Sequence, residues 1–439
     1  MIDFNPGGIQ TCKEENGIMK TKRTITRRDF LKTTAIGAAG MAAGSIGFPA
    51  ILRAAKEPII IGHQPDMTGF LASYGYFYDK AVKAAIDQVN SEGGIAGREV
   101  KYVMEDSASK ADVGVRAFRK LVLKDNADFV LGSVHSGIGI ATSPIAKELE
   151  TPYFPNGMSS AITGAKGNRW VFRSICHARM QVQASANLAF DKIGKDWFIV
   201  YMDYAWGHSH RDNFKNIIEG LGGNIIGTVA TPIGTKDFMP YLTKLPPGTN
   251  AIYYATLGAD TVGFLRQIRE IGYNGEKFSV ICPLDGVDVA KLGEIVEGDW
   301  ILEYLPRTLA DYDTAYHKAF REAIGIDEFG YEKGTGKPVT GSHYWSNYEN
   351  VFIIKGAIEK SGWKNRKDHS KFVETLEGMR FREGPGFPQG DLVMRAEDHQ
   401  GFHQHWMSRV EDGKLRVKYT IPIERVMYPA TVDFTREAL

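Results

Sequence analysis

Residues 128–160 read DFVLGSVHSGIGIATSPIAKELETPYFPNGMSS. The apolar run 128–132 is typical of a buried strand, residues 138–149 have the spacing of a helix, and residues 152–154 indicate a second short strand. Each strand passes directly into a loop rich in glycine and serine. Because the carboxyl ends of parallel strands meet at one edge of a sheet, these two loops predict a small-molecule site at that edge.

The helix predicted after Ser136 and Gly137 would present unpaired backbone N–H groups and the positive end of its dipole to this site. The second loop adds the N–H groups and hydroxyls of Met158, Ser159 and Ser160. Neutral donors of this kind suit a small anion. The same residues also fit ordinary helix N-caps, so the sequence leaves both interpretations open at this point.

This stretch belongs to a longer alternation of strands and helices. Before it, strands are predicted at 58–62 and 99–104, and a helix at 111–124 follows a long helix that ends before Asn90–Arg98. After it, a second series has strands at 196–201, 224–231, 251–255 and 278–281, and helices at 178–192, 208–220, 238–245 and 261–271. Such alternation predicts parallel sheets with right-handed crossovers.

The predicted fold class is therefore α/β, with two similar lobes, each a parallel sheet flanked by helices. Later helices at 311–323 and 341–360, and strand-like segments at 391–395 and 404–410, indicate that the chain crosses a hinge several times. The expected first lobe comprises residues 57–176 and about 305–396. The expected second lobe comprises residues 177–304 and about 397–430.

The composition excludes several classes of protein. A formal net charge of +1, with no long run of Lys or Arg, argues against a nucleic-acid partner. Three cysteines in 439 residues do not make a disulfide framework. Cys176 and Cys282 each adjoin an apolar run, and we interpret both as buried free thiols.

The N-terminus resembles an export signal. Arg27 and Arg28 precede a weakly apolar stretch rich in Ala and Gly at residues 33–50, which is typical of the twin-arginine route. Residues 1–55 are accordingly interpreted as this signal with an upstream extension, and the chain is expected in the periplasm or another extracytoplasmic space. Either Met1 or Met19 serves as the start.

Several motifs together resemble the branched-chain amino-acid type of solute-binding protein of ABC importers, which has the type I periplasmic binding fold. The most specific is the run from Asn90 to Arg98, NSEGGIAGR, and the others are Met67–Gly69 with Tyr74–Gly75, the Ser136 loop, residues 156–160 and residues 201–207. The resemblance covers nearly all of residues 57–425. It implies a non-enzymatic receptor that delivers a solute to the membrane subunits of a permease and carries no cofactor.

The resemblance also implies which residues bind the solute. In the first lobe, Ser136, the backbone of Met158, and Ser159 or Ser160 would bind a carboxylate, and several neutral donors there would limit the cost of desolvation. Tyr74 and Trp206 match aromatic residues that enclose the solute from the first and second lobes, although both rings could equally serve packing between the lobes.

Two positions depart from the pattern of the amino-acid binders. The acid that pairs with the ammonium group would be Asp285, one position late and shorter than Glu, and Leu257 stands where an aromatic residue is expected. A branched-chain or related amino acid, or a similar small carboxylate, is thus the expected solute. An aromatic acid or an amide such as urea is the alternative.

Other constellations predict less. His399, His403 and His405, with Asp398, could hold a metal, but their apolar neighbours favour a structural role, and no metal is expected. The run Ser136–Gly139 lacks the third glycine of a dinucleotide fingerprint, so an exported cofactor-dependent oxidoreductase is the weaker alternative.

Overall fold

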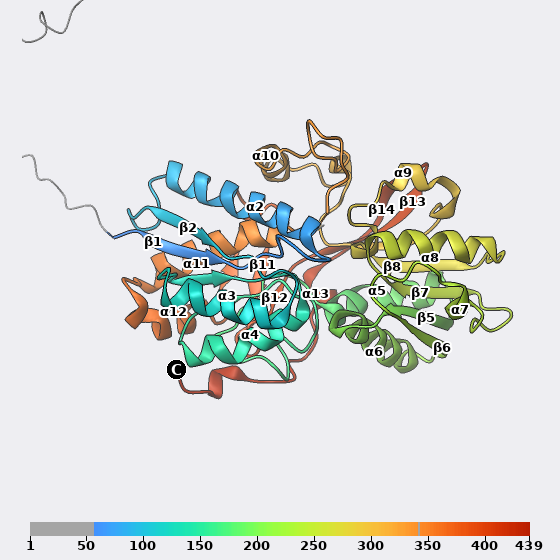
Figure 1. Ribbon diagram of the computed structural model, residues 1–439, viewed down its shortest axis with the longest axis horizontal. Helices are drawn as coiled ribbons and strands as arrows, with labels where there is room; N and C mark the ends of the chain where they lie inside the picture. The colour runs from blue at the N-terminus through green and yellow to red at the C-terminus, as the bar shows by residue number, and fades with distance from the viewer. Residues whose placement is uncertain (1–56, 341–342) are drawn as a thin grey trace, which may run out of the picture. The chain divides into compact units, whose positions relative to one another are not determined.

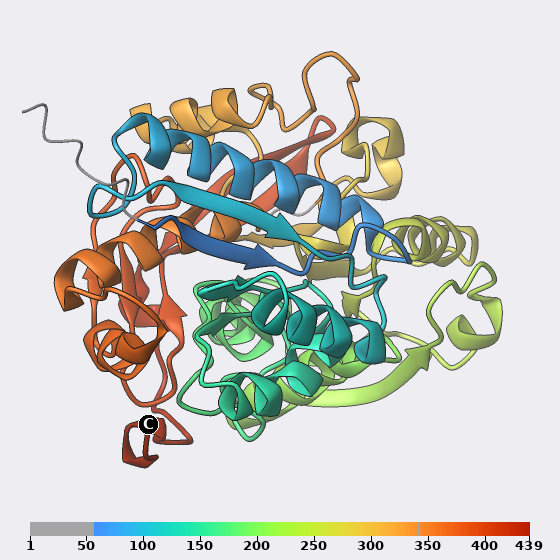
Figure 2. The same cartoon turned by 60° about the vertical axis from the view of Figure 1, so that its left-hand side comes forward.

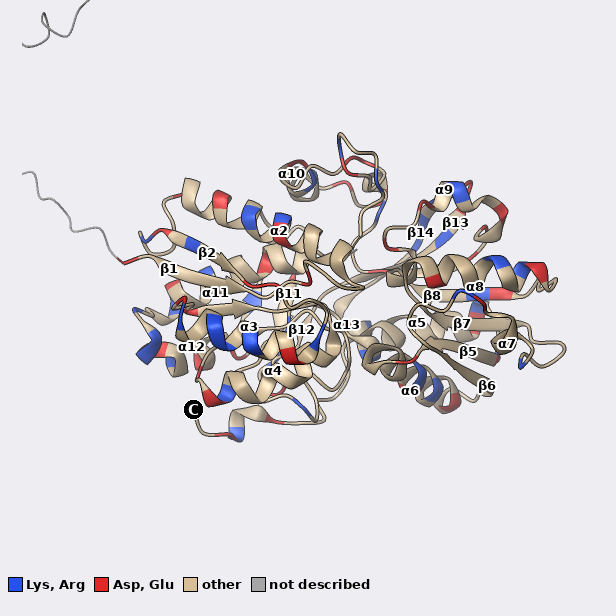
Figure 3. Cartoon of the chain, in the orientation of Figure 1, with Lys and Arg blue, Asp and Glu red and all other residues tan. Residues whose placement is uncertain are grey.

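The computed structural model describes residues 57–340 and 343–439, and the predicted export signal with Arg27 and Arg28 lies outside them. Two main sheets organise the described residues (Figure 1). Figure 3 shows Lys and Arg interspersed with Asp and Glu over the helices around both sheets, as the near-zero net charge implies. Within the described residues, no helix combines the length and the apolar character that crossing a membrane requires.

The first sheet is parallel and has the strand order β2-β1-β3-β4. Its strands are β1 (Ile59–His63), β2 (Val100–Met104), β3 (Phe129–Leu131) and β4 (Tyr153–Phe154). All three residues of β3 are buried, which explains its unbroken apolar sequence, since helices cover both faces of such a strand. The sheet thus sends the ends of β1, β3 and β4 to one edge.

Four helices cover this sheet. Helix α2 (Ala72–Ser91) packs against α11 (Trp345–Ser361), and α3 (Ala111–Leu123) packs against α4 (Ser136–Glu148). Figure 2 shows α2 lying along β1 and β2, with the α3 and α4 pair on the opposite face of the sheet. Helix α12 (His369–Leu376) packs against α11. A small antiparallel sheet of β10 (Arg380–Phe381), β11 (Leu392–Met394) and β12 (Gly401–Phe402) completes this lobe.

The second sheet has seven strands in the order β14-β13-β9-β8-β7-β5-β6. Strands β5 (Asp196–Met202), β6 (Asn224–Thr231), β7 (Ala251–Ala255), β8 (Glu276–Val280) and β9 (Trp300–Glu303) are parallel. Strands β13 (His405–Glu411) and β14 (Lys414–Ile421) join them antiparallel at one edge. The sheet carries α5 (Ala178–Lys192), α6 (Ala205–Gly220), α7 (Met239–Leu242) and α8 (Gly258–Glu270). Helices α9 (Val289–Leu292), α10 (Ala315–Ala323) and α13 (Ile423–Val426) lie in the connecting segments.

The predicted fold class is confirmed: two parallel sheets flanked by helices lie in one chain. Within residues 57–340 and 343–439, the chain passes between the lobes four times: between β4 and β5, between β9 and α11, between β12 and β13, and after α13, where Glu437 pairs with Lys147 of the first lobe. Because Gly401 and Phe402 pair with β11, we propose that the third crossing follows residue 402 rather than residue 397. The other lobe limits remain as proposed above.

Several local predictions were incomplete or wrong. Strands β9, β10, β12 and β14 were not expected, and α6 begins at Ala205, so Trp206 lies in its first turn and not in a loop. The reason is Gly207: a Cβ there would lie 1.9 Å from the carbonyl oxygen of Met202, so the glycine lets the helix start against the end of β5. The sequence pattern did not reveal this close approach.

Candidate functional site

A cavity between the two sheets is the candidate site. Its free volume is about 20 Å³, room for little more than one water molecule. Side chains therefore fill most of the space where the two lobes meet. Nine residues line it: Leu71, Tyr74, Val134, Met158, Tyr204, Trp206, Leu257, Cys282 and His343.

The first wall stands on the carboxyl ends of β1, β3 and β4. The buried carboxylate of Asp66, after β1, accepts hydrogen bonds from the Ser133 hydroxyl at 2.6 Å and from the N–H of Val134 at 3.1 Å. The Ser107 hydroxyl donates to the same carboxylate at 2.9 Å. Burial raises the pKa of Asp66 to about 6 against the effect of these donors. Asp66 thus fixes Val134 at the cavity.

Arg173 holds the loop that carries Met158. Its guanidinium is buried and donates through Nη1 to the carbonyl oxygens of Gly157 at 2.8 Å and Ser159 at 2.7 Å. Its Nε donates to Gln400 Oε1 at 2.8 Å. Burial lowers the pKa of Arg173 to about 10, which leaves it charged at neutral pH. The loop is therefore positioned from beneath by a cation that does not line the cavity.

The second wall stands on the ends of β5, β7 and β8. Tyr204 is the extended residue before α6, and its ring lies 5.9 Å from that of Trp206. Leu257 is likewise the extended residue before α8. Cys282 is the first residue of a 3₁₀ turn (Cys282–Leu284) that follows β8. None of the nine lining residues is Asp, Glu, Lys or Arg. The wall is mostly apolar and aromatic, as small-molecule sites commonly are.

Four residues that the sequence proposed for the site share this wall: Tyr74, Met158, Trp206 and Leu257. Tyr74 and Trp206 are 6% and 3% exposed, so their rings are nearly enclosed by the two lobes. The other four, Ser136, Ser159, Ser160 and Asp285, do not line the cavity.

Ser136, Ser159 and Ser160 make contacts within the protein. The Ser136 hydroxyl accepts the N–H of Ser159 at 3.1 Å. The Ser159 hydroxyl lies 3.0 Å from the hydroxyl of Ser209 on α6, and the Ser160 hydroxyl lies 3.1 Å from Nδ1 of His177. These serines thus link the predicted anion loop to the second lobe.

The start of α4 has its own cap. Nδ1 of His135 accepts the N–H of Ile138 at 3.2 Å, in the place where the sequence predicted a bound anion. Burial lowers the pKa of His135, so its ring is neutral at neutral pH and can accept this bond.

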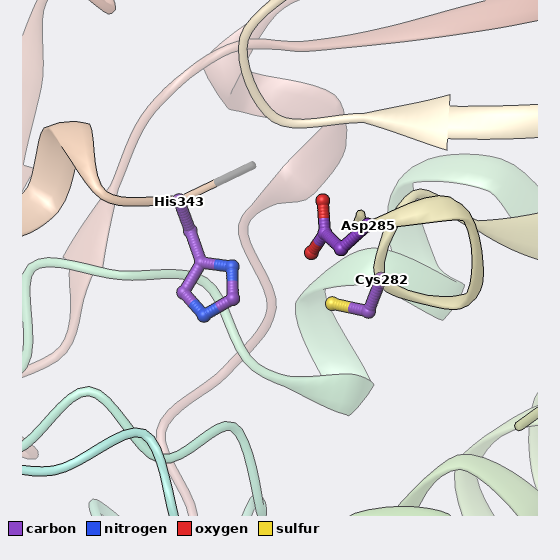
Figure 4. A group of neighbouring side chains, drawn as sticks. All are labelled: Cys282, Asp285 and His343. Carbon is purple, nitrogen blue, oxygen red and sulfur yellow. The ribbon is translucent and has the colours of Figure 1, made fainter. Parts of the chain in front are cut away.

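Asp285, the predicted partner of a ligand ammonium group, lies behind Cys282. It is 2% exposed, and its Oδ1 is 3.6 Å from Nη2 of Arg307. Its carboxylate points toward the ring of His343 (Figure 4). Asp285 is therefore close to the cavity without lining it.

Sequence reasoning missed Leu71, Val134, Tyr204, Cys282 and His343 as lining residues. Val134, Tyr204 and Cys282 each follow a predicted strand within three residues, so proximity to a strand end could have indicated them. His343 lies in none of the strand-end loops, and only the return of the chain between β9 and α11 brings it to the cavity. Burial lowers the pKa of His343 to about 3, so its ring is neutral.

The histidines near β12 and β13 have structural contacts. Nδ1 of His403 is 2.7 Å from the Gln389 side-chain nitrogen, and the rings of His403 and His405 stack with centroids 4.8 Å apart. His399 stacks on Phe172 at 4.0 Å. Cys176 and Cys282 are buried free thiols, which confirms the interpretation of both.

Two α/β lobes with a cavity at facing strand ends are accompanied by a sequence match to a known family. The sequence profile of the family described as "Periplasmic binding protein" matches residues 58–414. The chain belongs to this family. The match confirms the resemblance that the motifs around Asn90–Arg98 and Ser136 indicated.

Similar proteins agree with this assignment. The chain is 24% identical over 323 residues to "Leu/Ile/Val-binding protein homolog 7" of Brucella suis, which covers 70% of this chain and 78% of the relative. A solute-binding protein of an ABC transporter from Rhodopseudomonas palustris, solved with 3,4-dihydroxybenzoic acid, has a TM-score of 0.70 at 20% identity and covers 83% of this chain and 98% of its own. A leucine-binding protein from Thermotoga maritima has a TM-score of 0.70 at 21% identity and covers 83% and 99%. The two structures show the shared fold.

Proposed function

We propose that this periplasmic binding protein is the extracytoplasmic, non-enzymatic receptor of an ABC importer, which captures a small carboxylate between its lobes and delivers it to the permease. The cavity carries the proposal, because its wall is built from strand ends of both sheets, where α/β folds bind small molecules. This role requires no cofactor.

Residues 1–55, with Arg27 and Arg28, would direct export of the chain. An Arg27→Lys, Arg28→Lys variant should therefore remain in the cytoplasm. Undiminished export of this variant would refute the twin-arginine route.

Binding requires the lobes to move apart. A cavity of about 20 Å³ does not admit an amino acid. The Ser159 and Ser209 hydroxyls, 3.0 Å apart, and the Tyr74 hydroxyl, 3.4 Å from the carbonyl oxygen of Cys282, join the two walls across this space. Opening would free these groups, and hinge closure around a solute is an established motion of two-lobed binding proteins.

The solute would be a branched-chain or related amino acid. Leu71, Val134, Met158 and Leu257 offer an apolar surface for an aliphatic side chain. In the opened form, Ser136, Ser159, Ser160 and the N–H of Met158 would bind the carboxylate, and Asp285 would pair with the ammonium group. The name of the relative from Brucella suis, "Leu/Ile/Val-binding protein homolog 7", supports this choice of solute.

An aromatic carboxylate is the second candidate. Three aromatic rings, those of Tyr74, Tyr204 and Trp206, line the same cavity, and ring-to-ring packing favours an aromatic solute. The neighbour from Rhodopseudomonas palustris was solved with such an acid. An amide such as urea fits the same hydrogen-bonding groups but leaves these rings unused.

A thermal-shift panel tests the function. We expect one of leucine, isoleucine, valine, benzoate, 4-hydroxybenzoate, 3,4-dihydroxybenzoate, acetamide or urea to raise the melting temperature, because a ligand of the folded state stabilises it by mass action. Trp206→Ala should lower the affinity for that compound at least tenfold, since it removes a large part of the wall.

Trp300→Ala is the matched control. Trp300 begins β9 and stacks on Tyr419 at 6.3 Å, at the end of the strand opposite to the cavity. Its loss should leave the affinity within about twofold. Equal affinity of Trp206→Ala and the native chain would refute the site, and turnover of any panel compound would refute the receptor role.

A further inference from the structure

Three side chains that could bind a metal converge at the back of the cavity. The sulfur of Cys282, a carboxylate oxygen of Asp285 and a ring nitrogen of His343 all lie within 4.8 Å of one another. Figure 4 shows the three groups pointing toward a common space. Cys282 begins the 3₁₀ turn after β8 and Asp285 follows it, and His343 comes from the segment that leads into α11 of the first lobe. The cluster therefore joins the two lobes.

The imidazole of His343 gives the second observation. The residue is 0% exposed, and both Nδ1 and Nε2 are without a hydrogen-bond partner. The rings of Tyr74, Tyr78 and Tyr304 surround it at centroid distances of 5.6, 5.4 and 6.2 Å. Burying a polar nitrogen without a partner is unfavourable, and such groups in folded proteins usually have a functional explanation.

We propose that Cys282, Asp285 and His343 bind a zinc ion. A thiolate, an imidazole and a carboxylate form a ligand set that Zn²⁺ accepts, and three protein ligands leave a fourth tetrahedral position for water or a solute oxygen. Cys282 and His343 line the cavity, so that open position faces it. The ion would lie beside the cavity and would connect the second lobe to the first in the closed form, where Asp285 would bind the ion instead of a ligand ammonium group.

The required movement is small. Ligands about 2.2 Å from a tetrahedral ion lie about 3.6 Å apart, so the longest separation in the cluster must shorten by about 1.2 Å. Binding changes the charge of the cluster by one unit. Arg307, 3.6 Å from Asp285, offsets that carboxylate, and the ion replaces the proton of the Cys282 thiol, which is released to the solvent. The bound ion would thus bring one additional positive charge to the cluster.

The test uses the exported full chain after dialysis against a chelator, titrated with ZnCl₂ without any solute. We expect one zinc per chain by calorimetry and elemental analysis, with release of a proton. With Co²⁺ as the probe, a thiolate-to-cobalt charge-transfer band should appear. Cys282→Ser should abolish that band, and His343→Gln should weaken zinc binding at least tenfold.

Two buried residues outside the cluster provide matched controls. Cys176 is also a buried thiol, and the Nδ1 of His369 is bonded to the carbonyl oxygen of Glu150 at 2.9 Å. Cys176→Ser and His369→Gln should keep the cobalt band and the zinc affinity of the native chain.

Three results would overturn the zinc site: the absence of stoichiometric zinc binding to the native chain, a cobalt band that survives Cys282→Ser, or stoichiometric binding of Cu⁺ alone. The first of these needs no variant, so a folding defect cannot obscure it. Because the titration contains no solute, its failure leaves the carboxylate-receptor proposal standing, and a negative solute panel leaves the zinc site standing.

Discussion

At the scale of single residues, the cavity depends on buried charged and polar groups beneath its surface. Asp66 ties the end of β1 to Val134, and Arg173 holds the carbonyl oxygens on either side of Met158. Neither residue lines the cavity. Each buried ion is surrounded by hydrogen bonds, which offset the cost of taking a charge out of water. The shape of the wall therefore depends on groups that do not line the cavity.

Buried neutral histidines predict the response to acid. The side chain of His63 is fully buried in the folded chain, and this burial lowers its pKa to about 3. Its contribution to stability is complete above the unfolded value of 6.5 and is lost as the pH falls toward about 3, because the unfolded state binds the proton more tightly. At pH 5 the loss is about 2 kcal/mol for this residue.

Urea unfolding at pH 8 and pH 5 measures this loss. The free energy of unfolding of His63→Gln should fall by about 2 kcal/mol less between these pH values than that of the native chain. Glutamine keeps a polar group near the Tyr102 hydroxyl, which lies 2.8 Å from Nδ1 of His63. The same decrease in both proteins would show that His63 is not the titrating group.

At the scale of elements, the placement of Trp206 depends on how α6 begins. The first turn packs against the end of β5 only because residue 207 has no side chain, since a Cβ would lie 1.9 Å from the Met202 carbonyl oxygen. Gly207→Ala should therefore reduce the free energy of unfolding by about 1–3 kcal/mol and also weaken solute binding by displacing Trp206.

Gly220, at the other end of α6, is the control. A Cβ there meets no atom within 4 Å, so Gly220→Ala should be neutral or stabilising by up to about 1 kcal/mol. Chemical denaturation of the Gly207→Ala and Gly220→Ala variants measures both free energies of unfolding. If Gly207→Ala were as stable as Gly220→Ala, the close packing of α6 on β5 would not govern the site.

The same helix shows where prediction from sequence ends. Strands with continuous apolar runs, such as β3 and β7, and the amphipathic α3 were predicted within a few residues, because local pattern determines them. The start of α6 was not, because contact with β5 determines it. Strand β14 was also missed, although its sequence KLRVKYTI alternates polar and apolar residues as a half-buried strand does, so the local pattern did carry the signal.

The candidate site divides in the same way. Met158, Trp206 and Leu257 each follow a strand end within four residues, Tyr74 was proposed from the family resemblance, and all four share the cavity wall. Ser136 could be placed in the right loop, but the hydrogen bond from Ser159 to its hydroxyl is a tertiary contact that no motif encodes. His343 reaches the cavity through a chain crossing, which periodicity does not reveal.

At the scale of the whole molecule, polar contacts join the two lobes across the cavity. The Ser159 and Ser209 hydroxyls form one of them at 3.0 Å, and a hydrogen bond of this type contributes about 1 kcal/mol. A solute bound with micromolar affinity would supply about 8 kcal/mol, which exceeds several such hydrogen bonds, so lobes that open for a solute could close on it.

Ser209→Ala should therefore shift the lobes toward the open form. In small-angle X-ray scattering without solute, the variant should show a larger radius of gyration than the native chain, or an equal one if the native chain is already open. A smaller radius would contradict the role of this contact.

The central claim is that a solute binds between the lobes against Tyr74, Met158 and Trp206. A crystal structure of the exported chain, grown with the panel compound that gives the largest thermal shift, tests it most directly. We predict electron density for that compound in contact with these three side chains, within a cavity enlarged from about 20 Å³. Density for the compound at any other place, with the side chains between the lobes packed as they are now, would contradict the account.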